Sequence, residues 1–115
     1  MDLSIDTRDE AGWTILRAAG EVDLYTAPRL RERLLGAIEG GATRVVVDLV
    51  DVSFMDSSGL GVLIGGLRRL RERGGELALV CGEGAVRRVL AITGLDQLFP
   101  IHASVERATA SAGPG

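Results

Sequence analysis

An apolar run near the middle of the chain limits the possible folds more than any other feature. Residues 45–49 read Val-Val-Val-Asp-Leu, so the run is aliphatic and β-branched except for one aspartate. A strand with one face in water alternates apolar and polar residues, whereas a near-continuous run is typical of a strand covered on both faces. We therefore expect residues 45–49 to form the central strand of a sheet.

The chain before this strand predicts a hairpin followed by a helix. Apolar and polar residues alternate over 3–7 and, less regularly, over 13–17, and the turn-forming Asp-Glu-Ala-Gly segment between them favours an antiparallel pair. Residues 20–23 are then expected to lead away from the sheet. The next segment should be a helix that Thr26 caps and Gly40 ends, because leucine or isoleucine recurs at four-residue spacing between them.

Helices and strands alternate after the central strand. A second long helix is expected to begin near Asp56 or Ser57 and to end near Arg73, before two glycines. The remaining expected elements are a strand over 77–80, a helix over 85–92, an edge strand over 98–101 and a terminal helix over 103–111. This order predicts an α/β fold, with a single domain in which a mixed β-sheet of about four to five strands packs with about four helices.

The composition excludes several classes of function. All 13 basic residues are arginine, so the lysine that a P-loop or a Schiff-base enzyme needs is absent. The sequence holds one histidine, His102, and one cysteine, Cys81, which leaves no set of imidazoles or thiolates for a zinc site. A net charge of -3 argues against nucleic acid as a partner. We expect neither a metal nor a cofactor.

The sequence also lacks the patterns of exported and membrane proteins. The longest mainly apolar run, residues 59–67, is much shorter than the ~20 residues that span a bilayer. Met1 leads directly into polar alternation, without the basic and then apolar stretch of a signal peptide. These features predict a cytoplasmic protein without a membrane partner.

The segment that joins the central strand to the second long helix is the best candidate for a functional site. Residues 51–55 are expected to form the exit loop of the strand, and loops at the carboxyl ends of such strands carry the sites of α/β proteins. If Asp56 caps the helix, Ser57 and Ser58 lie in its first turn, where unpaired N–H groups and the helix dipole favour an anion such as a phosphate. Residue types alone favour a simpler interpretation, in which these side chains only cap the helix and the glycines that follow allow close packing.

Two other chemistries fit this segment poorly. Ser57 as a catalytic nucleophile would need a glycine two residues before it, where a methionine stands, and His102 is its only possible base. Asp48, Asp51 and Asp56 could suggest a magnesium site, but alternation along a strand should send them to different faces. Neither an acyl-transfer enzyme nor a metal site is therefore expected.

The second long helix carries an arginine run and several glycines. Four arginines and Glu72 fall within residues 68–73, and we expect a solvated helix face on which these charges pair. Gly61 and Gly65 are expected to be packing residues, because the dinucleotide-binding fingerprint would need another glycine where Ile64 stands.

Several segments together resemble one protein family. Phe-Met-Asp-Ser-Ser-Gly-Leu-Gly at 54–61 is similar to the signature of the STAS domain family, and closest to the free-standing anti-sigma factor antagonists of bacteria. Segments 20–27, 44–56, 74–77 and 86–95 resemble the family's other recurrent stretches. The resemblance implies a STAS-like fold.

The resemblance implies a STAS domain over residues 3–110 and a phosphorylation-switched binding protein rather than an enzyme. The small residues and the proline at the end of the chain predict a flexible C-terminal tail over 111–115. In that family a serine kinase that is also the anti-sigma factor phosphorylates the serine that matches Ser57, and a serine phosphatase removes the phosphate. The unphosphorylated antagonist binds the anti-sigma factor and so releases the sigma factor.

The resemblance also suggests which residues form the switch and contact the partner, namely Asp23, Asp56, Ser57, Ser58 and Gly59. Two alternatives remain open. Instead of a phosphorylation switch, the chain could be a STAS module that binds a small anion or a nucleotide, or a component of a larger stress-signalling assembly.

Overall fold

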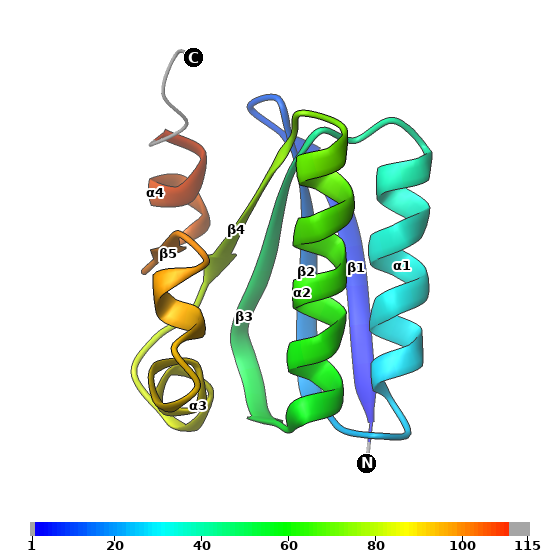
Figure 1. The fold of residues 1–115 in the computed structure, drawn as a ribbon. Coiled ribbons are helices and arrows are strands. Elements are labelled where there is room, and N and C mark those ends of the chain that lie inside the picture. The colour runs from blue at the N-terminus through cyan, green and yellow to red at the C-terminus, as the bar shows by residue number, and fades with distance from the viewer. Residues whose placement is uncertain (1, 111–115) are drawn as a thin grey trace.

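A mixed five-stranded sheet forms the centre of the protein in a computed structural model that describes residues 2–110 (Figure 1). Its strands lie in chain order and are β1 (Leu3–Glu10), β2 (Trp13–Val22), β3 (Arg44–Met55), β4 (Glu76–Val80) and β5 (Ile101–His102). The helices are α1 (Ala27–Glu39), α2 (Ser57–Glu72), α3 (Ala85–Ile92) and α4 (Val105–Ala110), with a short 3-10 helix η1 (Leu95–Gln97). β1 pairs antiparallel with β2, and the other neighbouring strands pair parallel. The predicted α/β class, with a mixed sheet of about four to five strands packed with about four helices, is confirmed.

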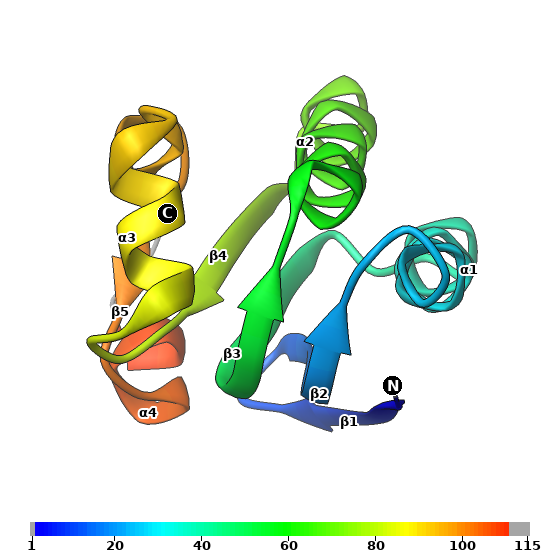
Figure 2. The same cartoon turned by 90° about the horizontal axis from the view of Figure 1, so that it is seen from below.

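Helices cover both faces of the sheet, but unequally (Figure 2). α1 and α2 lie side by side on one face and close the larger core together with α3, while α4 lies on the other face against β3, β4 and β5. β3 contributes to both cores, because Val45 and Val47 belong to the larger one and Val46 to the smaller one. The prediction that residues 45–49 form a central strand buried on both faces is therefore confirmed.

The smaller core is built around an aromatic ring at the start of β2. Trp13 is 2% exposed and packs with Val105 and Ala108 of α4. The Arg44 guanidinium lies 5.0 Å from the centre of the indole ring, which is a cation–π distance, and it also pairs with Glu76 at 3.5 Å. This end of the sheet is therefore closed by a buried ring that an arginine covers.

β2 and β3 are longer than the sequence predicts. Only Asp23 of the segment 20–23 leaves the sheet, and the expected exit loop 51–55 is a continuation of β3. The expectation is wrong because the two segments pair with each other, up to Val22 beside Met55. The polar side chains at 51 and 53 are exposed, so the local pattern resembles that of a loop although the backbone is paired.

The hairpin turn is shorter than the sequence predicts. It consists of Ala11 and Gly12, both with positive φ, as in the two-residue turns whose twist matches that of the flanking strands. Asp9 and Glu10, expected in the turn, therefore belong to β1.

The last elements agree with the prediction in kind but not in bounds. The edge strand predicted over 98–101 starts only at Ile101, because Pro100 has no N–H with which to extend the ladder. The helix predicted over 103–111 is present as α4. Its predicted last residue and the predicted flexible tail over 111–115 lie outside the described residues.

The glycines of α2 divide into two groups by what surrounds them. A Cβ at Gly66 would collide with the buried side chain of Leu34, so α1 and α2 can approach closely at this point. No heavy atom lies within 4 Å of a Cβ built at Gly61 or Gly65. The expectation that Gly61 and Gly65 are packing residues is therefore wrong.

Alanine at these two kinds of position should have opposite effects on stability. Alanine is favoured over glycine inside a helix by about 1 kcal/mol, and nothing opposes this gain in Gly65→Ala. In Gly66→Ala the methyl group enters the space of Leu34, where overpacking costs about 1–3 kcal/mol. Urea unfolding of the two variants measures the difference. Equal free energies of unfolding would contradict the assignment of the outer and inner faces of α2.

Candidate functional site

The ends of β2 and β3 hold two segments together at the lower edge of the molecule in Figure 1. Val22 pairs with Met55, and the N–H of Asp56 donates to the carbonyl oxygen of Val22 at 3.1 Å. The loop 23–26 between β2 and α1 therefore starts beside the residue that precedes α2. Asp23 and Asp56, which are far apart in the sequence, each follow directly on one member of the Val22–Met55 pair.

The loop 23–26 is held by its own hydrogen bonds. The Asp23 carboxylate accepts from the N–H groups of Tyr25 and Thr26, each at 2.9 Å. The Thr26 hydroxyl accepts from the N–H of Asp23 at 2.9 Å and donates to the carbonyl oxygen of Glu21 at 2.7 Å. Thr26 stands at the N-cap position of α1, but the expectation that its side chain caps the helix is wrong, because these loop contacts occupy the hydroxyl.

The same bonds set the charge state of Asp23. The N–H group of Thr26, and to a lesser degree that of Tyr25, stabilises the ionised carboxylate and holds the pKa of Asp23 below its usual value. The partial desolvation of the carboxylate raises this pKa, but by less than the hydrogen bond from Thr26 lowers it. The loop is therefore built around a carboxylate that is charged at neutral pH.

Asp56 caps α2 as predicted. Its backbone is extended, and its carboxylate accepts from the N–H of Ser58 at 2.9 Å. Ser57 is the first residue of the helix and is exposed, while Ser58 is partly exposed. The Ser57 hydroxyl is therefore accessible without any opening of the fold.

Gly59 lies beneath this turn rather than on its surface. It is buried, and a Cβ built on it would lie 2.7 Å from Met55 Cγ and 2.7 Å from Val22 Cγ1. The missing side chain allows the first turn of α2 to rest on the paired ends of both strands. Of the five residues predicted for the site, Gly59 thus supports the surface, whereas Asp23, Asp56, Ser57 and Ser58 reach it at least in part.

Three apolar side chains near these segments are exposed. Leu24 is 68% exposed, Tyr25 86% and Phe54 46%, on residues that precede or follow the strand ends. Leu24 and Tyr25 are adjacent apolar residues in a loop too short for a core of its own, which is a signal that the sequence alone provides. Exposed apolar groups of this kind are frequent where proteins bind one another.

The aspartates that could suggest a magnesium site do not converge. Asp48 is buried and accepts from the N–H of Val50 at 3.1 Å, Asp51 pairs with Arg17 on the exposed face, and Asp56 is the helix cap. Among the described residues, no group of three or more His, Cys, Asp or Glu side chains is placed to hold a metal ion.

None of the described helices combines the length and the apolar character needed to cross a membrane.

The sequence matches a family model and curated proteins over nearly its whole length. Residues 3–108 match the model of the STAS domain. The chain is 38% identical over 106 residues to the anti-sigma-B factor antagonist of Bacillus subtilis (strain 168), an alignment that covers 92% of this chain and 96% of the relative.

Solved structures with the same fold include regulators of the same kind. An anti-sigma factor antagonist from Mycobacterium paratuberculosis superposes with a TM-score of 0.89 at 28% identity, covering 96% of this chain and 93% of that one. The unphosphorylated form of the anti-sigma factor antagonist SpoIIAA gives a TM-score of 0.78 at 29% identity, with coverage of 91% and 92%. The phosphorylated form of SpoIIAA from Bacillus gives 0.72 at 26% identity, with coverage of 93% and 97%.

Two substitutions at Asp23 separate its hydrogen bonds from its charge. Asp23→Ala should loosen the loop 23–26, because the N–H groups of Tyr25 and Thr26 lose their acceptor. Asp23→Asn keeps an acceptor oxygen and should preserve most of the order of the loop. Amide hydrogen exchange at residues 25 and 26 measures this effect. Unchanged exchange in Asp23→Ala would show that the carboxylate does not hold the loop.

The lowered pKa of Asp23 predicts that acid loosens this loop. The ionised form accepts the hydrogen bonds, so the stabilisation is complete above the ordinary aspartate pKa and is lost as the pH falls through the lower pKa of the folded protein. An NMR titration of the Asp23 carboxyl carbon should give a midpoint below that of an unstructured peptide with the same local sequence. A midpoint at or above the peptide's value would contradict the hydrogen bonds from Tyr25 and Thr26 to the ionised Asp23 carboxylate.

Proposed function

The chain belongs to the STAS domain family, and on this premise we propose that it is an anti-sigma factor antagonist switched by phosphorylation of Ser57. The observation that carries the proposal is the exposed Ser57 hydroxyl at the first residue of α2, in a chain whose relatives are antagonists of this kind. The unphosphorylated protein binds the anti-sigma factor and thereby releases a sigma factor. The phosphorylated protein does not bind.

The electrostatics of the helix start support this switch. A phosphate on Ser57 adds about -1.5 to -2 charges next to the carboxylate of Asp56. In the free protein, water and salt screen the repulsion, so the fold is kept. In a complex the phosphate loses its water while it still faces Asp56. A loss of about 3 kcal/mol in binding free energy lowers the affinity more than a hundredfold.

The other site residues take supporting parts in this proposal. Asp23 holds the loop 23–26 in shape, Asp56 caps α2 and repels a phosphate, and Gly59 seats the helix on the strand ends. Ser58 donates its backbone N–H to the cap and is a neighbour of the switch rather than its target. The exposed Leu24 and Tyr25 offer apolar contacts to the partner.

The proposed function also implies which proteins modify the antagonist and in which compartment it acts. The anti-sigma factor is the serine kinase that modifies Ser57, and a serine phosphatase restores the binding form. The antagonist itself catalyses no reaction. Because a sigma factor acts in transcription, the protein works in the cytoplasm.

The geometry favours this switch over a module that binds a small anion or a nucleotide. The N–H of Ser58, a donor that such an anion would use, is already taken by the Asp56 carboxylate at 2.9 Å. The negative charge of that carboxylate also opposes the entry of a free anion at the helix N-terminus. A phosphate that is covalently attached to Ser57 needs no such binding site.

Substitutions at Ser57 test the switch. Ser57→Ala should keep the fold, bind the anti-sigma factor and accept no phosphate, whereas Ser57→Asp should weaken the complex because it places a permanent negative charge at the helix start. Mass spectrometry after incubation with the kinase and ATP locates the phosphate, and isothermal titration calorimetry measures the affinities.

Ser58→Ala is the matched control, because the cap uses the backbone N–H of this residue and not its hydroxyl. It should still be phosphorylated on Ser57. Phosphate found on Ser58 or Thr26, with Ser57 unmodified, would disprove the assignment of the switch.

A further inference from the structure

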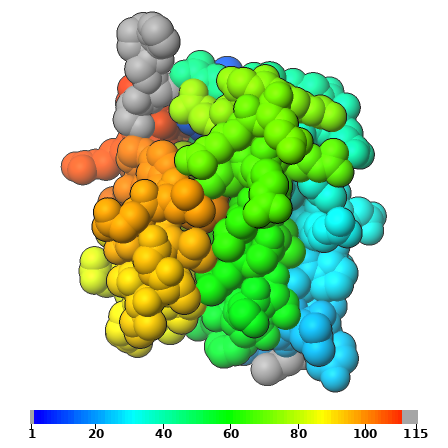
Figure 3. Space-filling model, viewed as in Figure 1, coloured from blue at the N-terminus to red at the C-terminus, as the bar shows by residue number. Residues whose placement is uncertain are grey.

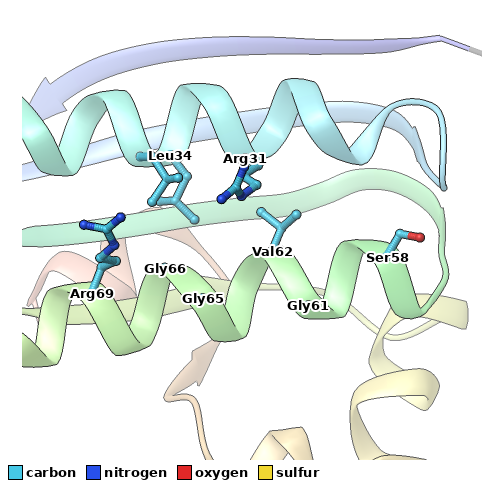
Figure 4. A pocket seen from close by; sticks show the side chains of 9 residues that line it. Arg31, Leu34, Ser58, Gly61, Val62, Gly65, Gly66 and Arg69 are labelled. Carbon is cyan, nitrogen blue, oxygen red and sulfur yellow. The ribbon is translucent and has the colours of Figure 1, made fainter.

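A groove of about 320 Å³ runs between α1 and α2 on the face of the molecule seen in Figure 3. Its apolar lining comes from both helices, with Leu34 and Leu35 on α1 and Val62 on α2. Figure 4 shows Leu34 and Val62 directed into the space between the two helices, with Val62 nearer the Ser58 end and Leu34 nearer the Arg69 end. One end of the groove lies at Ser58, one residue from the proposed switch, and the other end lies at Arg69.

Two glycines of α2 widen this groove without an internal reason for being glycine. Gly61 and Gly65 stand one turn apart on its wall, and a Cβ at either position would meet open space. Glycine is the least favourable residue inside a helix except for proline. Since the interior does not require these glycines, their effect is on the outside, where they allow another backbone to come close to α2.

The groove carries positive charge on both sides. Arg31 projects from α1 toward α2, and Arg69 projects from α2 toward α1, and no acidic residue is part of the lining (Figure 4). Neither arginine forms an ion pair with a described residue. α1 and α2 together hold six arginines and three glutamates, a net charge of +3, whereas the whole chain has a net charge of -3.

The arginine run at the end of α2 is also less neutralised than the sequence suggests. The expectation that Glu72 pairs with these arginines is wrong, because no ion pair joins Glu72 to any of them among the described residues. Arg73 instead donates to the carbonyl oxygen of Ile38 at 2.8 Å. The two-helix face is therefore a positive patch on an acidic protein.

We propose that the groove between α1 and α2 receives an acidic amphipathic helix of the anti-sigma factor, an inference that rests on the proposed function. The helix packs its apolar side over the partly exposed Leu35 and Val62 and approaches α2 closely at the two glycines. Its acidic side chains pair with Arg31 and Arg69. An apolar floor between two cationic walls suits an amphipathic helix of opposite charge.

The charge of the groove argues against a second copy of this chain as the occupant. In a two-fold dimer each copy would present the same surface to the other, so two positive faces would meet. A helix of negative charge has no such conflict. It also links the groove to the switch, because a phosphate on Ser57, one residue from the end of the groove at Ser58, repels a bound acidic helix.

Bulky residues at the two glycines test the close approach. Gly61→Leu and Gly65→Leu should each weaken binding of the purified cognate anti-sigma factor at least tenfold in isothermal titration calorimetry. Their melting temperatures should not fall below that of the wild-type protein, because a Cβ at either position meets no heavy atom within 4 Å. Gly36→Leu is the matched control, since Gly36 is also a helical glycine that faces open space but does not line the groove.

Charge reversal tests the acidic character of the occupant. Arg31→Glu and Arg69→Glu should each weaken binding about tenfold, and the loss should shrink at high salt. Arg107→Glu on α4 changes the net charge equally on the opposite face of the sheet and should leave binding unchanged. Wild-type affinity in the glycine and arginine variants overturns the proposal. So does a homodimer of the wild-type protein that Gly65→Leu dissociates.

Ser57→Asp in the same titrations separates the two proposals. If Ser57→Asp weakens binding and the groove variants do not, the switch stands and the groove proposal fails. If the groove variants weaken binding and Ser57→Asp does not, the groove is the docking site and the phosphorylation switch is wrong. If the wild-type protein does not bind the anti-sigma factor, both proposals fail.

Discussion

The parallel pairing of β2 with β3, carried through to Val22 and Met55, is the constraint on which the rest of the site depends. Both strands end together, so the loop 23–26 and the start of α2 are fixed beside each other. The register shifts along the pairing, between Arg17 and Ala19 and again between Gly20 and Glu21. Gly20 lies at the second shift and has a φ of +121°, a backbone conformation that favours glycine. A Cβ at this position would also collide with the backbone of Asp2.

The sequence predicted those parts of the fold that local pattern determines. The valine run defines the buried strand, and an aspartate before an apolar helix defines its cap, without reference to distant residues. The lengths of β2 and β3 could not be predicted in this way. Whether an exposed residue such as Asp51 belongs to a strand or to a loop depends on pairing with a segment more than thirty residues away, here shown by its contact with Arg17. Thr26 was misjudged for a similar reason, because its hydroxyl is taken by Glu21 on the preceding strand.

The candidate site was predictable in part. Ser57 and Asp56 follow from the cap pattern together with the resemblance to a family, whereas the groove along α2 had no signal in the order of residues. Gly65 and Gly66 are adjacent glycines that the sequence does not distinguish. Only their surroundings in the fold show that Gly66 lets α1 pack closely, whereas Gly65 faces open space. The segregation of charge between the helical face and the rest of the molecule likewise emerges only when the helices are placed side by side.

The two strongest chromophores of the chain lie at opposite ends of one strand. The sequence holds a single tryptophan and a single tyrosine. Trp13 begins β2 and is 2% exposed, whereas Tyr25 follows its other end and is 86% exposed. The ten residues of β2 separate the strand's ends by about 30 Å. Indole emission therefore reports on the buried core and phenol absorbance on the exposed loop 23–26, so the native chain provides two optical probes without any introduced label.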